Sequence, residues 1–247
     1  MNYCLVLNRS FSRSSVVLKQ IPTNTKGKTA SAIKWLTRQL NDPFVKMARY
    51  KNYRARSAFK LVEIDDKYKI LSPGMIVVDC GAAPGAWTQV IVERLHLARF
   101  DGMSSPDAVN SKVISIDINA ISPIEGAHIL SKLDFTKPIS QAQVLTLLDG
   151  KLADVICSDM APNACGYNNI DHERQIALAL SALAFATTTL KPKGTFLTKI
   201  WEGSLSTTVV ESAKKFFEEV RIVKPQACHA ESVETYVLAK YFKGVVK

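Results

Sequence analysis

The chain has 247 residues, of which 47% are hydrophobic and 22% charged, and this suits one sizeable α/β domain with a short extension. It has no run of roughly 18 uninterrupted apolar residues, which argues against a membrane-spanning helix. Its five cysteines form no Cys-x-x-Cys pair and only four histidines accompany them, so no metal site is expected and the thiols fit a reducing compartment.

The formal net charge of +10 is concentrated near the N-terminus. The first 60 residues hold 13 of the 32 Lys and Arg residues but only one of the 22 acidic residues, and the remainder is close to neutral. Residues 1–20 contain basic residues and serines but no acid. This composition is typical of a mitochondrial presequence or of a disordered, mildly basic tail.

From residue 57 onward, apolar runs and amphipathic segments alternate. Strands are expected at 75–80, 112–118, 128–135, 153–160, 194–201, 221–225 and 234–242. Helices are expected at 57–70, 86–95, 139–148, 172–190 and 207–219. A polar segment at 98–111 is predicted to be a surface insertion. The alternation predicts an α/β fold with a doubly wound, mainly parallel sheet in one domain, and the last two strands form its antiparallel edge.

The first strand leads into a turn of small residues in the stretch VVDCGAAPGAW (77–87). Glycines let the backbone approach a ligand, and the following helix offers N–H groups to an anion. The stretch lacks a Walker A motif and the G-x-G-x-x-G spacing of dinucleotide folds, so an NAD-dependent dehydrogenase is poorly supported. A merely structural turn is the alternative.

Three strands end in an acid, at Asp79, Asp117 and Asp159, and loops gather at this end of a parallel sheet. A nucleoside ligand with one carboxylate fits this pattern, with Asp117 bonding ribose hydroxyls and the loop N–H groups holding the carboxylate.

Lys199 lies inside an apolar strand, where an ammonium group is costly to bury without a partner. Extension of its side chain to the surface is the alternative. Lys60 on the first helix and Glu234 in the last strand would complete, with Asp159, a cluster of two bases and two acids. Such a cluster can hold one lysine neutral while the other stays charged.

Five segments together resemble the FtsJ/RrmJ class of ribosomal RNA 2′-O-methyltransferases: VVDCGAAPGAW, SDMAPN, FLTKIWEG, YRARSAFKL and SVETYVLA. The resemblance extends from about Trp35 to the end of the chain. It is closest to the branch that methylates a uridine of mitochondrial large-subunit ribosomal RNA, on the segments WLTRQLNDPFVKMARYKNYRARSAFKL and EGAHILSKLDFTKP. It implies a single Rossmann-like, S-adenosylmethionine-dependent methyltransferase domain at 57–247, with a seven-stranded sheet and helices on both faces.

The resemblance also implies the site residues. The Lys-Asp-Lys-Glu tetrad of the family falls on Lys60, Asp159, Lys199 and Glu234. The S-adenosylmethionine site is similar to Gly81, Ala82, Ala83, Pro84, Gly85, Ala86, Trp87, Asp117, Asp134, Phe135 and Asp159. Ala86 stands where bacterial relatives have a second glycine. Lys199 would take the proton of the ribose 2′-hydroxyl, and Lys60 would supply positive potential.

The implied partner is ribosomal RNA, within an assembling large subunit in the mitochondrial matrix. Residues 21–56 would then be a basic RNA-contacting segment, because basic side chains alternate there with aromatic ones that can stack on bases. A solvated basic helix face is the alternative. Two other functions stay open: ribose methylation of transfer RNA or another ribosomal RNA, and an RNA-binding assembly factor whose catalysis is dispensable.

Overall fold

The structure, a computed structural model, describes residues 21–96, 110–229 and 231–244. The expected presequence at 1–20 and most of the expected insertion at 98–111 therefore lie outside the described residues. The chain divides into two compact units, Met1–Lys46 and Met47–Lys247. No helix within the described ranges is long and apolar enough to cross a membrane.

The smaller unit contains α1 (Ala30–Asn41) and the start of α2 (Pro43–Tyr50). The Thr29 hydroxyl caps α1 by accepting a hydrogen bond from the backbone N–H of Ala32 at 3.2 Å. A proline begins α2, where its missing N–H costs nothing because the first N–H groups of a helix have no partner within the helix. Residues 30–50 are therefore helical apart from Asp42.

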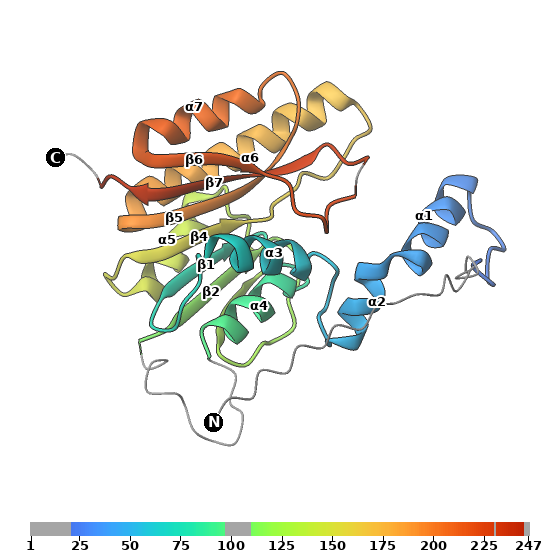
Figure 1. The fold of residues 1–247 in the computed structure, drawn as a ribbon, viewed down its shortest axis with the longest axis horizontal. Coiled ribbons are helices and arrows are strands. Elements are labelled where there is room, and N and C mark those ends of the chain that lie inside the picture. The colour runs from blue at the N-terminus through green and yellow to red at the C-terminus, as the bar shows by residue number, and fades with distance from the viewer. Residues whose placement is uncertain (1–20, 97–109, 230, 245–247) are drawn as a thin grey trace, which may run out of the picture. The chain divides into compact units, whose positions relative to one another are not determined.

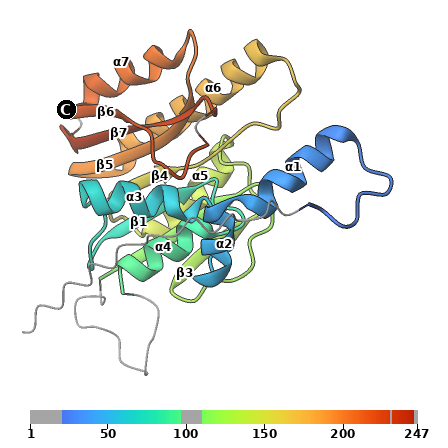
Figure 2. The same cartoon turned by 45° about the vertical axis from the view of Figure 1, so that its right-hand side comes forward.

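The larger unit is a sheet covered by helices on both faces (Figures 1 and 2). Its helices are α3 (Ala58–Tyr68), α4 (Ala86–Arg94), α5 (Pro138–Leu148), α6 (Asn168–Thr189) and α7 (Ser206–Phe216). Its strands are β1 (Ile76–Cys80), β2 (Lys112–Asp117), β3 (Ala127–Ser131), β4 (Ala153–Ser158), β5 (Leu190–Trp201), β6 (Phe217–Val223) and β7 (Glu234–Phe242).

The sheet has seven strands in the order β3-β2-β1-β4-β5-β7-β6. The first five strands of this order run parallel, and β7 runs antiparallel to both β5 and β6. The prediction of a mainly parallel α/β sheet with an antiparallel edge is confirmed. In this order β1 lies between β2 and β4. The chain adds β2 and β3 on one side of β1 and the later strands on the other, so the strand order reverses at β1.

Successive side chains of a buried strand point to opposite faces of the sheet, and the core is therefore divided into two clusters, one on each face. Val78 and Cys80 of β1 contribute to the cluster under α5, α6 and α7, whereas Val77 contributes to the cluster under α3 and α4. A strand buried on both faces must be apolar on both faces, which explains the continuous apolar runs in the sequence. Because β1 to β5 run parallel, their carboxyl ends lie at the same edge of the sheet.

Several predicted boundaries are wrong by a few residues. Helix α6 begins at Asn168 rather than at residue 172, and the Asp171 carboxylate stabilises this start by accepting hydrogen bonds from the N–H groups of Cys165 and Gly166. Helix α7 ends at Phe216, and the expected last turn of that helix is instead β6. Pairing of β6 with β7 prevails there over the local helical pattern.

Candidate active site

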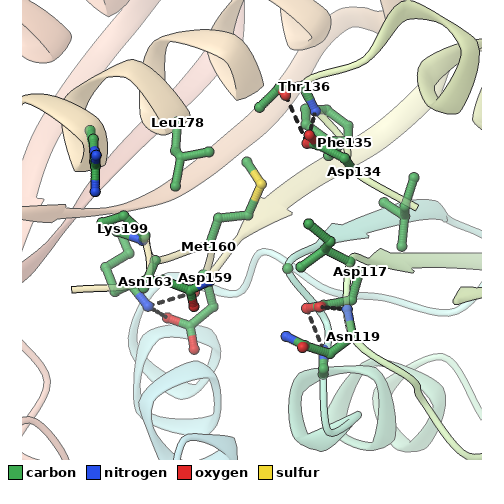
Figure 3. A pocket seen from close by; sticks show the side chains of 17 residues that line it. Asp117, Asn119, Asp134, Phe135, Thr136, Asp159, Met160, Asn163, Leu178 and Lys199 are labelled. Atoms are coloured by element: carbon green, nitrogen blue, oxygen red, sulfur yellow. Dashed lines mark hydrogen bonds and ion pairs between the residues drawn. The ribbon is translucent and has the colours of Figure 1, made fainter. Parts of the chain in front are cut away.

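A cavity of about 570 Å³ lies at the carboxyl ends of β1, β2, β4 and β5, beside the point where the strand order reverses (Figure 3). This is where open α/β sheets bind their ligands. Of the predicted site residues, those that line the cavity are Gly81, Ala83, Asp117, Asp134, Phe135, Asp159 and Lys199. Those that do not are Ala82, Pro84, Gly85, Ala86, Trp87, Lys60 and Glu234.

The turn after β1 depends on a glycine at its first position. Gly81 has a φ of +77°, and a Cβ there would lie 2.7 Å from both the backbone N and the Cα of Met160. The N–H of Gly81 donates to the Ile116 carbonyl at 2.9 Å, and the N–H of Asp159 donates to the Cys80 carbonyl at 3.0 Å. The loops that follow β1 and β4 therefore pass too close to each other for any larger residue.

Trp87, at the other end of the glycine-rich stretch, belongs to the core. Its side chain is 2% exposed, its Nε1 donates to the Ser57 carbonyl at 2.9 Å, and its ring lies 5.6 Å from the ring of Tyr236. Trp87 thus connects the loop to α3 and β7 rather than lining the cavity.

Asp117 presents a carboxylate held by backbone groups. Its Oδ2 accepts from the N–H of Ala83 at 2.9 Å and its Oδ1 from the N–H of Asn119 at 2.7 Å. Figure 3 shows Asp117 and Asn119 on the opposite side of the cavity from Lys199 and Asp159. The orientation of this acceptor is therefore fixed before any ligand arrives.

Asp134 and Phe135 come from the loop between β3 and α5. The Asp134 carboxylate accepts from the hydroxyl and N–H of Thr136 at 2.7 and 3.0 Å, and these bonds hold its pKa below the usual range. The ring of Phe135 packs edge-on against Phe185, with 5.3 Å between the centroids.

Asp79, the third acid at a strand end, is fully buried and does not line the cavity. The Thr88 hydroxyl donates to its Oδ2 at 2.8 Å. Burial raises the pKa of Asp79 to about 7, against the lowering effect of this hydrogen bond, and the Asp159 and Asp117 carboxylates raise it further. Of the three acids at strand ends, Asp79 is therefore the one that does not face the cavity.

Lys199 is buried in β5 and its amine is turned toward Asp159. Its side chain is 9% exposed. Its Nζ donates to the backbone carbonyl of Asp159 at 2.5 Å and lies 3.1 Å from Oδ1 of the same residue. The alternative of extension to the surface is excluded by this geometry (Figure 3).

Lys60 and Glu234 form an ion pair behind the cavity. Burial lowers the pKa of Lys60, but the Asp159 and Glu234 carboxylates raise it more, so it lies above its usual value. Burial likewise raises the pKa of Glu234, while Lys60 and Lys199 together lower it below its usual value. Both groups are therefore charged at neutral pH.

Tyr236, which sequence reasoning did not single out, connects the Lys60–Glu234 ion pair with the Lys199–Asp159 ion pair. Its hydroxyl lies 2.8 Å from Asp159 Oδ1 and 2.9 Å from Glu234 Oε1. Burial, followed by the two carboxylates, raises its pKa well above the usual value, so the phenol stays protonated and donates to one carboxylate at a time. Its position two residues after Glu234 was the available signal, because alternate residues of a strand share a face.

An α/β sheet with a cavity at the strand-order reversal, beside a buried lysine and carboxylates, is typical of a Rossmann-like enzyme with a small-molecule site. Within the described residues, no group of three or more His, Cys, Asp and Glu side chains is placed to hold a metal. The family model described as FtsJ-like methyltransferase matches residues 53–242. The chain belongs to this family and is a methyltransferase.

Relatives and solved structures agree with this assignment. The chain is 42% identical over 226 residues to the Drosophila melanogaster protein named "rRNA methyltransferase 2, mitochondrial", covering 92% of this chain and 89% of that one. It is 44% identical to the Parvibaculum lavamentivorans "Ribosomal RNA large subunit methyltransferase E", with 92% and 88% covered. The crystal structure of a ribosomal RNA methyltransferase from Plasmodium falciparum matches with a TM-score of 0.66 at 29% identity, covering 78% of this chain and 100% of that one.

Proposed function

We propose that the protein uses S-adenosylmethionine to methylate the ribose 2′-hydroxyl of a uridine in mitochondrial large-subunit ribosomal RNA. The observation that carries the proposal is the placement of Lys199 and Asp159 at one side of the cavity and of Asp117 at the other. A cofactor that lies across the cavity would have its ribose at Asp117 and its reactive end beside Lys199.

The residues present fit S-adenosylmethionine. The cavity volume of about 570 Å³ lies within the range of small-molecule sites. Its carboxylates suit the ligand, because Asp117 can accept from ribose hydroxyls and Asp159 can face a sulfonium. Bound S-adenosylmethionine supplies an electrophilic methyl group. The N–H groups of Ala82, Ala83 and Gly85 already donate within the protein, so Asp117 and Asp134 would hold the cofactor.

Lys199 is the proposed general base. A neutral amine has two N–H groups and one lone pair, and the carbonyl and Oδ1 of Asp159 account for two donors. The lone pair of Nζ would then accept the proton of the ribose 2′-hydroxyl, which would make that oxygen a nucleophile for the methyl group that S-adenosylmethionine supplies. S-adenosylhomocysteine would be the leaving group. General-base assistance of this kind contributes about 100- to 10,000-fold.

Lys60 keeps its charge and supplies positive potential near the developing alkoxide. Glu234 holds Lys60, and the Tyr236 hydroxyl connects Glu234 with Asp159. We therefore assign Lys199 and Asp159 to the reacting centre. Lys60, Glu234 and Tyr236, which do not line the cavity, would support it through charge and positioning.

The identity of the substrate rests on the chain's N-terminal charge and on its relatives. Residues 21–56 would contact RNA, residues 1–20 would be the presequence, and the methyltransferase domain would act in the matrix. All three of the similar proteins described above are named for ribosomal RNA, and one of them is also named mitochondrial.

The direct test maps 2′-O-methylation across the organellar large-subunit RNA in cells with and without the protein. Loss of one 2′-O-methyluridine, restored by the wild-type chain, is expected. An unchanged map of this RNA together with a lost ribose methyl group in transfer RNA would contradict the proposed substrate. Rescue of the methyl group by a catalytically dead chain would contradict the enzyme assignment.

A further inference from the structure

Arg54 is directed at the cofactor loops. Its Nη1 donates to the Pro84 carbonyl at 2.9 Å and to the Ser122 carbonyl at 2.8 Å, and its Nη2 donates to the Pro123 carbonyl at 2.8 Å. Pro84 belongs to the glycine-rich loop after β1, whereas Ser122 and Pro123 belong to the loop that follows β2 and Asp117. One guanidinium therefore connects the two loops that frame the proposed cofactor site.

The surroundings of Arg54 are built to hold it. Its backbone N–H donates to Gln89 Oε1 at 2.8 Å, and Gln89 Nε2 in turn donates to the Asn52 carbonyl at 3.0 Å. A Cβ at Gly85 would lie 2.8 Å from Nη1 of Arg54. The same Cβ would lie 2.6 Å from Cδ1 of Ile124, and Gly85 has a φ of +108°, so the loop packs closely against both Arg54 and the segment after β2.

The contacts of Arg54 differ from those expected of an RNA-binding arginine. Its donors meet backbone carbonyls of its own domain, and Arg56, two residues later, likewise donates to the Ala227 carbonyl. Lys51, in the same basic segment, is exposed. A planar guanidinium can bridge several carbonyls at fixed angles, whereas an ammonium group acts as a point charge.

We propose that Arg54 is a positioning residue for the cofactor: it fixes the glycine-rich loop and the loop after β2 at one separation, and so raises the affinity for S-adenosylmethionine. The inference rests on the proposed function, since it takes that cofactor as the ligand. Without Arg54 the two loops would no longer be held together. Ordering them would then reduce the free energy of cofactor binding.

The test separates the shape of the arginine from its charge. Arg54→Lys keeps the charge but loses the planar fork, and Lys51→Ala removes a charge without touching the loops. Binding of S-adenosylmethionine is measured by calorimetry, and RNA binding is measured at several salt concentrations, with thermal unfolding as a check on folding. We expect Arg54→Lys to weaken cofactor binding by about tenfold and to leave the affinity for RNA unchanged at each salt concentration. Lys51→Ala should retain the wild-type cofactor affinity.

A second variant covers the case in which Arg54→Lys does not fold. Gln89→Ala frees the backbone of Arg54 and should weaken cofactor binding by about threefold, in the same direction. Cofactor affinities within twofold of wild type in the folded variants would overturn the inference. A lower affinity for RNA in Arg54→Lys, with unchanged cofactor affinity, would assign Arg54 to RNA instead, because a lysine loses the two-pronged phosphate contact of an arginine. If the wild-type protein itself binds no S-adenosylmethionine, the proposed function fails.

Discussion

The two sides of the cavity are built in different ways. On the side of β1 and β2, the shape is set by backbone: Gly81 lets two loops touch, and N–H groups fix both oxygens of Asp117. On the side of β4, β5 and β7, the shape is set by a cluster of charged side chains around Asp159 and Lys199. The first side is suited to holding a ligand, and the second to moving a proton.

This difference predicts that substitutions on the two sides will change different quantities. Changes on the backbone side should act through sterics and reduce cofactor affinity. Changes on the charged side should act through electrostatics and reduce turnover, because the glycine-rich loop and Asp117 are held by backbone groups and not by those side chains. Four predictions test this separation, in order of expected size.

Lys199→Ala should give the largest effect. Turnover should fall by about 100- to 10,000-fold, because the proton of the 2′-hydroxyl loses its acceptor, while the dissociation constant of S-adenosylmethionine stays within about threefold of wild type. Single-turnover methyl transfer and calorimetry measure the two quantities. Lys214→Ala, an exposed lysine of α7, is the matched control. Substantial activity in Lys199→Ala would remove the assignment of the base.

Gly81→Ala should reduce cofactor affinity by more than about tenfold and destabilise the fold by about 1–3 kcal/mol, because the new Cβ meets the backbone of Met160. Gly150→Ala is a close control, since Gly150 also has a positive φ, +72°, but a Cβ there would meet nothing within 4 Å. Calorimetry and chemical unfolding measure both effects. Equal behaviour of the two variants would show that the close approach of the loops is unimportant.

Tyr236→Phe should lower kcat by about tenfold and leave cofactor affinity near wild type, because a buried hydroxyl between two carboxylates is lost. Tyr241→Phe, at a half-exposed tyrosine of the same strand, should behave as wild type. Steady-state kinetics over a range of cofactor concentrations separates kcat from KM. A change confined to KM would place Tyr236 on the binding side instead.

Asp79→Asn should change how stability depends on pH. The pKa of Asp79 is raised to about 7 in the folded state, so ionisation is costlier there than in the unfolded chain. The wild-type protein should lose about 1.4 kcal/mol of unfolding free energy per pH unit relative to Asp79→Asn from about pH 5 to 6, and the loss should become smaller through pH 7 and end near pH 8. Chemical unfolding at pH 5, 6, 7 and 8 measures the difference. Parallel profiles would contradict the buried position of this acid.

The parts of the site that could be predicted from the sequence are those with a local pattern. The glycine-rich turn and Asp117 follow continuous apolar strands, so their place at the sheet edge follows from strand direction alone. Lys199 stood out because it interrupts such a strand. Each of these features can be predicted from a short stretch of sequence.

The parts that could not be predicted depend on contacts between distant segments. Tyr236 lies opposite Lys199 through the antiparallel register of β5 and β7, and this register appears only once the strands pair. The sequence does not distinguish Arg54 from the other basic residues of its segment, because its carbonyl partners lie about 30 and 70 residues further along the chain. Asp79 shared the strand-end pattern of the other acids, but its burial depends on how α4 covers it.

The most direct test of the central claim is the chemical identity of the methylated product. The purified protein is incubated with methyl-labelled S-adenosylmethionine and large-subunit ribosomal RNA, and the RNA is digested to nucleosides. The label should appear in 2′-O-methyluridine with the wild-type chain and be absent with Lys199→Ala. Label on a base, or equal label on the ribose with both chains, would contradict proton removal from the 2′-hydroxyl by Lys199.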